Sequence, residues 1–181
     1  MQFIGTINDR ANHYVSVRTH PEWPHLLPSE AWVAFTIADE GDEALLYRGA
    51  RCIFNHNETY TCSAGTRAAL AEQHFDDLDV WKHLEYEQRT SKKYDEDLFI
   101  CTTAHQNFGE GFWYATTLAY DPYRDIERVV CVDFTRRKVR KHLIELIQRI
   151  NRGWLPSDKK IEWPLYDAER WEEAKIEFEK L

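Results

Sequence analysis

The spacing of apolar residues changes near residue 64, and this change constrains the fold more than any other feature. Before it, short runs rich in β-branched and aromatic residues alternate with turn-forming residues, which is typical of strands. The connections between the runs are short, so we expect a mostly antiparallel sheet in the N-terminal third. Its expected strands are residues 1–7, 13–19, 31–38, 44–55 (one or two strands broken near Gly49) and 58–64.

After residue 64 the apolar residues recur mainly at helical spacing. We expect helices at residues 65–75, 76–93 and 136–152, and strands at 97–104, 113–120 and 126–134. A last amphipathic helix follows Asp167, with one apolar face. The pattern predicts an α+β protein with helices concentrated after residue 64, folded as a single domain over residues 1–181. The apolar face of the C-terminal helix consists of Trp171, Ala174, Phe178 and Leu181.

The composition argues against several classes of protein, including membrane and secreted proteins. No run approaches the roughly 18 apolar residues that a membrane span needs, so we expect no membrane association. The N-terminus lacks the pattern of a signal peptide, and the four cysteines form no CxxC pair. We therefore expect a cytoplasmic protein with reduced thiols and no cofactor; a Cys52–Cys62 disulfide is the weaker alternative.

Positive charge gathers at one predicted helix start. Thr135 is placed as the N-cap, with Phe134 and Val139 forming a hydrophobic staple around it. Cations near a helix N-terminus are disfavoured by the helix dipole, because that end already carries a partial positive charge. An anionic ligand is one reason for such an arrangement. The cations are Arg136, Arg137, Lys138, Arg140 and Lys141.

The charge of the whole chain is segregated. Residues 128–152 hold eight Lys and Arg against two acids, a balance of +6, while the complete chain is at −8, which leaves −14 elsewhere. A phosphate-bearing ligand, either a nucleotide or nucleic acid, would explain a basic site in an acidic protein. The alternative is internal pairing with Asp76, Asp77 and Asp79, or with the C-terminal Glu169, Glu172, Glu173, Glu177 and Glu179.

A second candidate stretch is the glycine-containing segment at residues 105–113, which we expect to be a loop. His105 leaves a predicted strand and has the chemistry of a general acid or base. Trp113 and Tyr114 follow and could stack on a base or sugar ring. The simpler interpretation is a turn whose aromatic residues pack in the core.

Asp133 ends the strand that precedes the basic helix, where it could orient a catalytic base or bind a metal. It could equally pair with Arg136 or Arg137. If chemistry occurs, His105 and Asp133 are the expected catalytic residues, and phosphodiester hydrolysis is the natural reaction class. The histidines match no defensible metal-ligand spacing, so no metal is predicted.

The sequence is also compatible with a second class of function, in which the protein acts by binding another protein. The chain contains no P-loop, no GxSxG and no HExxH, which lowers the expectation of an enzyme. Its acidic remainder would complement a basic protein partner. An inhibitor or immunity-type factor acting on a nucleic-acid-processing enzyme, without catalysis, is therefore the alternative to a phosphate-binding protein.

Overall fold

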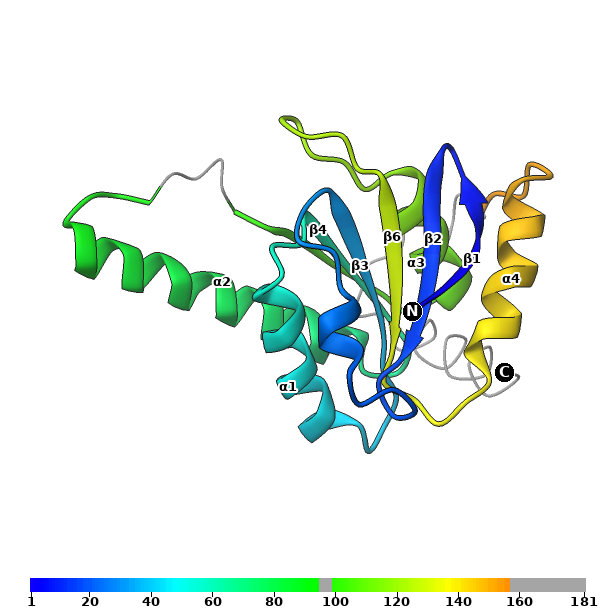
Figure 1. The fold of residues 1–181 in the computed structure, drawn as a ribbon, viewed down its shortest axis with the longest axis horizontal. Coiled ribbons are helices and arrows are strands. Elements are labelled where there is room, and N and C mark those ends of the chain that lie inside the picture. The colour runs from blue at the N-terminus through cyan, green and yellow to red at the C-terminus, as the bar shows by residue number, and fades with distance from the viewer. Residues whose placement is uncertain (95–98, 157–181) are drawn as a thin grey trace.

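The computed structural model describes residues 1–94 and 99–156, and its centre is a six-stranded sheet in the order β1-β2-β6-β3-β4-β5 (Figure 1). The C-terminal amphipathic helix predicted after Asp167 lies outside the described residues. The strands are β1 (Gln2–Ile7), β2 (Arg10–Ser16), β3 (Trp32–Ile37), β4 (Tyr60–Ala64), β5 (Cys101–His105) and β6 (Arg128–Asp133). The helices are α1 (Glu43–Phe54), α2 (Ala68–Thr90), α3 (Phe108–Thr117) and α4 (Val139–Ile150), with a short 3-10 helix at Trp23–Leu26.

The α+β class is confirmed, and the sheet is mixed. The antiparallel pairing expected for the N-terminal third is present between β1 and β2. The other neighbours are parallel, namely β2 with β6, β6 with β3, β3 with β4, and β4 with β5. Because a parallel pair requires a crossover, α1 connects β3 to β4 and α2 connects β4 to β5. The five strands from β2 to β6 in chain order run in the same direction, so their carboxyl ends all lie along the same side of the sheet.

Helices cover both faces of the sheet, and each face has its own core (Figure 1). On one face, α3 and α4 pack Phe112 and Leu143 against strand residues such as Phe35. On the other face, α1 and α2 pack Leu46 and Phe75 in a second cluster. In the described part of the chain, no helix has both the length and the apolar character needed to cross a bilayer.

Helix α1 replaces the strands that we expected at residues 44–55. Its buried residues include Leu46, Ala50 and Ile53, which recur at helical spacing. Gly49 belongs to the same buried face, and a Cβ atom there would lie 2.1 Å from Cε1 of Phe134. Glycine at this position therefore allows the helix to approach Phe134 at the end of β6, and it does not mark a break between strands.

Other elements also differ from the sequence-based expectation, beginning with β2, which spans Arg10–Ser16 instead of residues 13–19. Residues 113–120 do not form a strand, because most of them belong to α3, whose N-cap Asn107 accepts a hydrogen bond from the backbone N–H of Glu110 at 3.0 Å. The helices expected at 65–75 and 76–93 form one continuous helix, α2, whose second half extends beyond the sheet (Figure 1). The acidic residues between them therefore lie within a helix and do not form a turn.

Candidate functional site

The loops that follow β2 and β6 leave the sheet toward opposite faces. The loop after β2 leads to the 3-10 helix, whose Trp23 packs in the core beneath α1 and α2. The loop after β6 leads to α4, whose Val139 and Leu143 pack in the core on the other face. In open α/β sheets, ligands bind at the carboxyl edge where neighbouring loops diverge in this way.

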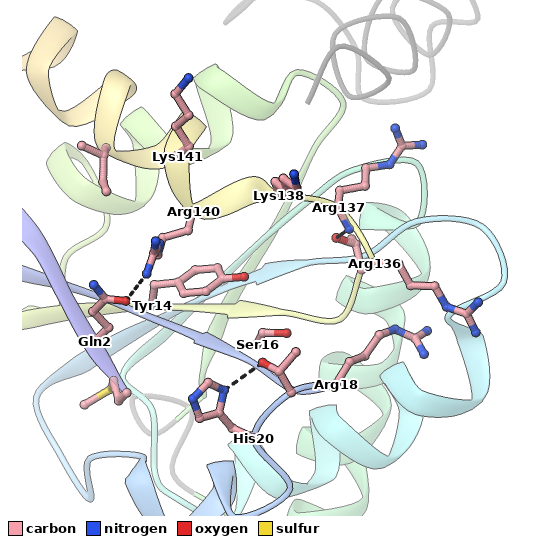
Figure 2. Close-up of a pocket in the computed structure, with 14 residues that line it drawn as sticks. Gln2, Tyr14, Ser16, Arg18, His20, Arg136, Arg137, Lys138, Arg140 and Lys141 are labelled. Carbon is pink, nitrogen blue, oxygen red and sulfur yellow. Dashed lines mark hydrogen bonds between the residues drawn. The ribbon is translucent and has the colours of Figure 1, made fainter.

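A cavity of about 820 Å³ occupies this position (Figure 2). Its volume is within the range of sites for small ligands and cofactors. Figure 2 shows β2 side chains Tyr14 and Ser16 between Arg140 on one side and Arg136 on the other. The cavity is lined by Met1, Gln2, Tyr14, Ser16, Arg18, Thr19, His20, Thr135, Arg136, Arg137, Lys138, Arg140, Lys141 and Ile144.

The cavity is strongly basic. All five cations of the predicted helix start line it, together with Thr135 and one further cation, Arg18, from the end of β2. No Asp or Glu is among the described residues that line it. The structure thus places the five cations of the predicted helix start around one concave surface, next to the N-terminus of α4.

Helix α4 begins at Val139, three residues later than expected. Thr135 is therefore not its N-cap. The Thr135 hydroxyl donates a hydrogen bond to Asp133 and accepts one from the backbone N–H of Arg137 at 3.1 Å, which shapes the loop between β6 and α4. Lys138 occupies the N-cap position and provides no side-chain cap. An N-cap of this kind leaves the first N–H groups of the helix without a side-chain acceptor.

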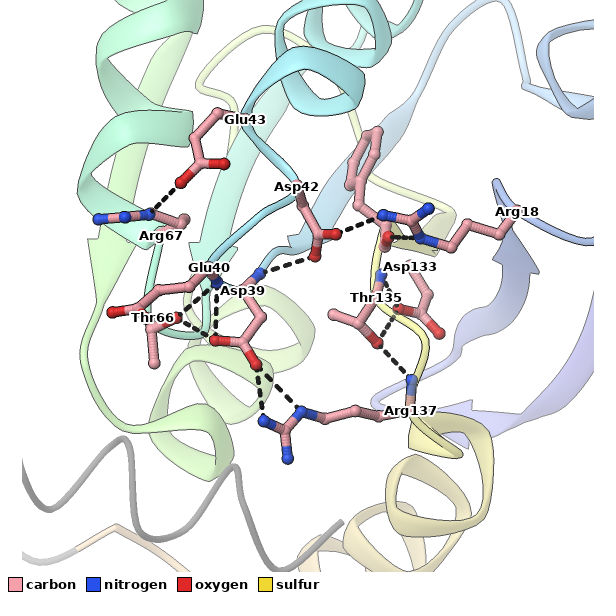
Figure 3. Close-up of polar contacts among 11 residues, drawn as sticks. Arg18, Asp39, Glu40, Asp42, Glu43, Thr66, Arg67, Asp133, Thr135 and Arg137 are labelled. Atoms are coloured by element: carbon pink, nitrogen blue, oxygen red, sulfur yellow. Dashed lines mark hydrogen bonds and ion pairs between the residues drawn. The ribbon is translucent and has the colours of Figure 1, made fainter.

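Two of the six cations are held by carboxylates from the loop after β3 (Figure 3). Arg137 donates to Asp39 through Nε at 3.0 Å and Nη2 at 2.7 Å. Arg18 pairs with Asp42 and donates to the carbonyl oxygen of Phe134 at 2.7 Å. Although burial opposes it, hydrogen bonds from Thr66, the N–H of Glu40 and Arg137 lower the pKa of Asp39. These pairs fix the loops after β2, β3 and β6 relative to one another.

Three cations of the cavity have no carboxylate partner among the described residues. They are Arg136, Lys138 and Arg140, and Arg140 instead donates to the side-chain oxygen of Gln2. Lys141 lies 3.9 Å from Glu145 in a mostly exposed pair, and such pairs contribute little. The acids of the C-terminal segment lie outside the described residues. Within residues 1–94 and 99–156, internal pairing thus involves only part of the basic cluster.

The acids that we proposed as internal partners on α2 have other contacts. Asp76 accepts a hydrogen bond from the Thr102 hydroxyl, and Asp79 lies 3.4 Å from His83. In residues 1–94 and 99–156, no ion pair links Asp76, Asp77 or Asp79 to the basic loop. Helix α2 covers the opposite face of the sheet from α4, which explains the separation.

Asp133 lies beneath the cavity and does not line it. It is 1% exposed, and it pairs with neither Arg136 nor Arg137 within the described structure. Its Oδ1 accepts from the backbone N–H of Thr135 at 2.8 Å and from the Thr135 hydroxyl at 2.7 Å, while Oδ2 accepts from Tyr14 at 2.6 Å. Burial raises the pKa of Asp133, and these hydrogen bonds partly offset the effect. Asp133 therefore positions two residues that do line the cavity.

His105, Trp113 and Tyr114 lie elsewhere, at β5 and α3, and none of them lines the cavity. The Nε2 of His105 is 3.1 Å from the Thr103 hydroxyl, and its ring centroid is 5.0 Å from that of Tyr114. The Tyr114 hydroxyl in turn lies 3.1 Å from that of Tyr60. These contacts match the simpler interpretation in one respect, since the aromatic side chains pack inside the fold. The expected loop or turn was wrong, because the segment is helical from Phe108 onward, within α3.

Among the lining residues that sequence reasoning missed are Tyr14, Ser16, Arg18 and His20. All four belong to β2 or the loop after it. The parallel pairing of β2 with β6, in which Ser16 is opposite Asp133, brings them to the basic loop. Because an antiparallel N-terminal sheet was expected, nothing in the sequence placed β2 beside β6 and the basic loop. In the described part of the chain, no three His, Cys, Asp or Glu side chains are grouped so that they could hold a metal ion.

Comparison with known proteins gives one match. A family model described as Domain of unknown function (DUF7684) matches residues 11–150. No curated protein and no solved structure matches this chain. The matched range begins in β2 and ends with α4, so it contains most of the residues that line the cavity.

Proposed function

Because the matched residues make up most of the chain, the protein belongs to the DUF7684 family, and we propose that it binds a phosphate-bearing ligand in the basic cavity. The observation that carries this proposal is the lining of the cavity, which includes six Lys and Arg and no carboxylate among the described residues. Six cations placed together in an acidic protein are stabilised when an anion is bound between them.

The chemistry of the lining suits phosphate. Arginine offers paired N–H donors that match two phosphate oxygens, and lysine adds a mobile point charge. The start of α4 contributes the positive end of a helix dipole and N–H groups without a side-chain acceptor. An anion at this position is attracted both to the cations and to the positive end of the helix dipole, and this attraction offsets the repulsion between them. Tyr14 and Ile144 add less polar surface for the rest of the ligand, such as a base or sugar.

We propose binding of the ligand alone, without its hydrolysis. His105 lies outside the cavity, and both carboxylate oxygens of Asp133 already accept hydrogen bonds. His20 is the histidine that lines the cavity, and its Nδ1 lies 2.9 Å from the Thr19 hydroxyl. No described carboxylate reaches the cavity to serve as a general base. The expected phosphodiester hydrolysis therefore has no support from the arrangement of these residues.

The test is a titration of the complete chain with nucleotides, followed by calorimetry, and with fluorescently labelled oligonucleotides, followed by anisotropy, at several salt concentrations. The Arg136→Glu/Lys138→Glu variant removes two cations that have no carboxylate partner in the described structure. A matched control, Arg48→Glu/Lys92→Glu, makes the same charge change at exposed positions outside the cavity. Binding that weakens with salt, disappears in the first variant and persists in the control is the expected result.

Two other outcomes separate the alternatives. If the wild type binds no phosphate-bearing compound at low salt, the proposal is wrong, and a basic protein partner for the acidic remainder of the chain becomes the next hypothesis. The same titration on a variant with five glutamates changed to glutamine tests whether C-terminal acids compete for the cavity, because their removal would then tighten binding several-fold. These glutamates are Glu169, Glu172, Glu173, Glu177 and Glu179.

A further inference from the structure

The cations without a carboxylate partner are spread across the cavity. Among the described residues these are Arg136, Lys138 and Arg140. Figure 2 shows Arg136 beside Arg18 at one side and Arg140 beside Gln2 at the other, with Tyr14 and Ser16 between them. A single phosphate group contacting one side would leave the other side without an anion. The distribution of charge therefore indicates more than one anionic group in the ligand.

Charge balance leads to the same conclusion. The pairs Arg137–Asp39, Arg18–Asp42 and Lys141–Glu145 are internally neutral. The three remaining cations contribute three positive charges, and the α4 N-terminus adds about half a charge more. A phosphate monoester carries only about −1.5 to −2 at neutral pH. A chain of two or three phosphates carries about −3 to −4, which matches the cavity, by the same ionisation rules.

We propose that the ligand carries at least two linked phosphates, as a nucleoside diphosphate or triphosphate does. This inference rests on the proposed phosphate-binding function. The phosphate chain spans the cavity from Arg136 to Arg140, with Lys138 near the start of α4 between them. Both arginines are exposed and reach the ligand as paired donors, whereas Lys138 acts as a point charge.

A compact polyphosphate fits this protein better than a long nucleic acid. Outside residues 128–152 the chain has a net charge of −14, taken from the −8 of the complete chain and the +6 of this segment. An extended polyanion would leave the cavity and pass over this acidic remainder, which repels it. A small ligand stays within the basic region. The cavity volume of about 820 Å³ suits a nucleotide.

The experiment is a calorimetric series on the full chain with adenosine, AMP, ADP and ATP, and with pyrophosphate and tripolyphosphate, both with and without Mg²⁺. We expect affinity to rise about tenfold from AMP to ADP, because each added phosphate gains charged hydrogen bonds. In Arg136→Gln and Arg140→Gln, ADP and ATP should lose more affinity than AMP. Arg48→Gln, an exposed change outside the cavity, should alter nothing.

Each contrary outcome has a distinct meaning. If AMP, ADP and ATP bind with equal affinity and Arg136→Glu/Lys138→Glu abolishes binding, the site takes one phosphate; the inference then fails while the proposed function stands. If no compound of the series binds at low salt, both fail. If a single-stranded oligonucleotide binds at the same residues more tightly than ATP, the ligand is a nucleic acid and the small-polyphosphate inference is overturned.

Discussion

Tyr14 on β2 donates a hydrogen bond of 2.6 Å to Oδ2 of the buried Asp133 at the end of β6. This contact joins two parallel strands directly beneath the basic cavity. The other oxygen of Asp133 holds the loop that carries the cations, through the backbone N–H and hydroxyl of Thr135. One carboxylate therefore fixes both the β2 wall of the cavity and its basic loop.

Removal of the Tyr14 hydroxyl should destabilise the fold. In Tyr14→Phe, Oδ2 of Asp133 stays buried and loses its donor, at an expected cost of about 1–3 kcal/mol. Urea denaturation followed by tryptophan fluorescence measures this loss as a lower midpoint with an unchanged slope. Tyr120→Phe is the control, because Tyr120 is 68% exposed and should remain at wild-type stability. Equal stability of the two variants would show that the hydrogen bond does not contribute.

The Asp39–Arg137 pair should compete with the ligand. In Asp39→Asn, the negative charge that accepts two hydrogen bonds from Arg137 is removed, so Asp39 no longer competes with a phosphate for this guanidinium. We expect the affinity for ADP to rise about three- to tenfold at low salt, and the gain to shrink as salt screens the charges. Calorimetry at 20 and 200 mM salt, about a threefold change in Debye length, measures both effects.

The control for this change is Asp9→Asn, which removes an exposed carboxylate from the turn between β1 and β2, at the amino end of β2. It should leave ADP affinity unchanged. Weaker binding in Asp39→Asn would indicate that Asp39 organises the loop for the ligand and does not compete with it, and the prediction would then be wrong.

Local patterns in the sequence were sufficient for several parts of the fold. The helix that follows β6 was predicted from the spacing of Val139, Leu143, Leu146, Ile147 and Ile150. The first four are buried, and Ile150 is partly buried against the same core. The strand before it was equally clear, since β6 is a continuous apolar run ending at Asp133. The basic residues of this region were also identified from a local pattern, since they lie next to one another in the chain.

Other parts of the fold depend on contacts between distant residues. Residues 44–55 were expected to form one or two strands broken near Gly49, but they form a helix in which this glycine accommodates the ring of Phe134, 85 positions along the chain (134 − 49). The parallel pairing of β2 with β6 is equally non-local. Arg18 could not be assigned to the site without that pairing, since no local motif connects it to Arg136.

The four cysteines should differ sharply in reactivity. Cys101, at the start of β5, is exposed, and Cys52 is half-buried. Burial raises the pKa of Cys62 to about 12, and burial, with the nearby Asp133, raises that of Cys131. Because the thiolate is the nucleophile, a chromogenic disulfide reagent should label Cys101 first and Cys52 more slowly. Cys62 and Cys131 should react only after denaturation.

Cys101→Ser tests this assignment. The variant should lack the fast phase and keep the slower one, with the total after denaturation reduced by one thiol. A fast phase that persists in Cys101→Ser would mean that another cysteine is the accessible one. Labelling of Cys62 or Cys131 in the native protein would contradict their burial among the strands.

Glu58, between α1 and β4, should make stability depend on pH. It is 2% exposed, and within the described structure neither carboxylate oxygen has a hydrogen-bond partner. Burial raises its pKa from 4.5 to about 7; its own backbone N–H, Lys82 on α2 and the nearby Thr61 lower it in part, while Asp79, itself paired with His83, raises it. A raised pKa means that the folded state holds the proton more tightly. The stabilisation is therefore full below pH 4.5 and is lost as pH rises toward 7.

Glu58→Gln should remove this dependence. The loss in the wild type across this window is about 3 kcal/mol, so the variant should match the wild type near pH 4.5 and exceed its free energy of unfolding at pH 8. Urea denaturation at pH 4.5, 6 and 8 measures the difference. Glu85→Gln on the exposed surface of α2 is the control and should follow the wild type at every pH. A Glu58→Gln variant less stable than the wild type at pH 8 would show that the ionised carboxylate has a stabilising partner.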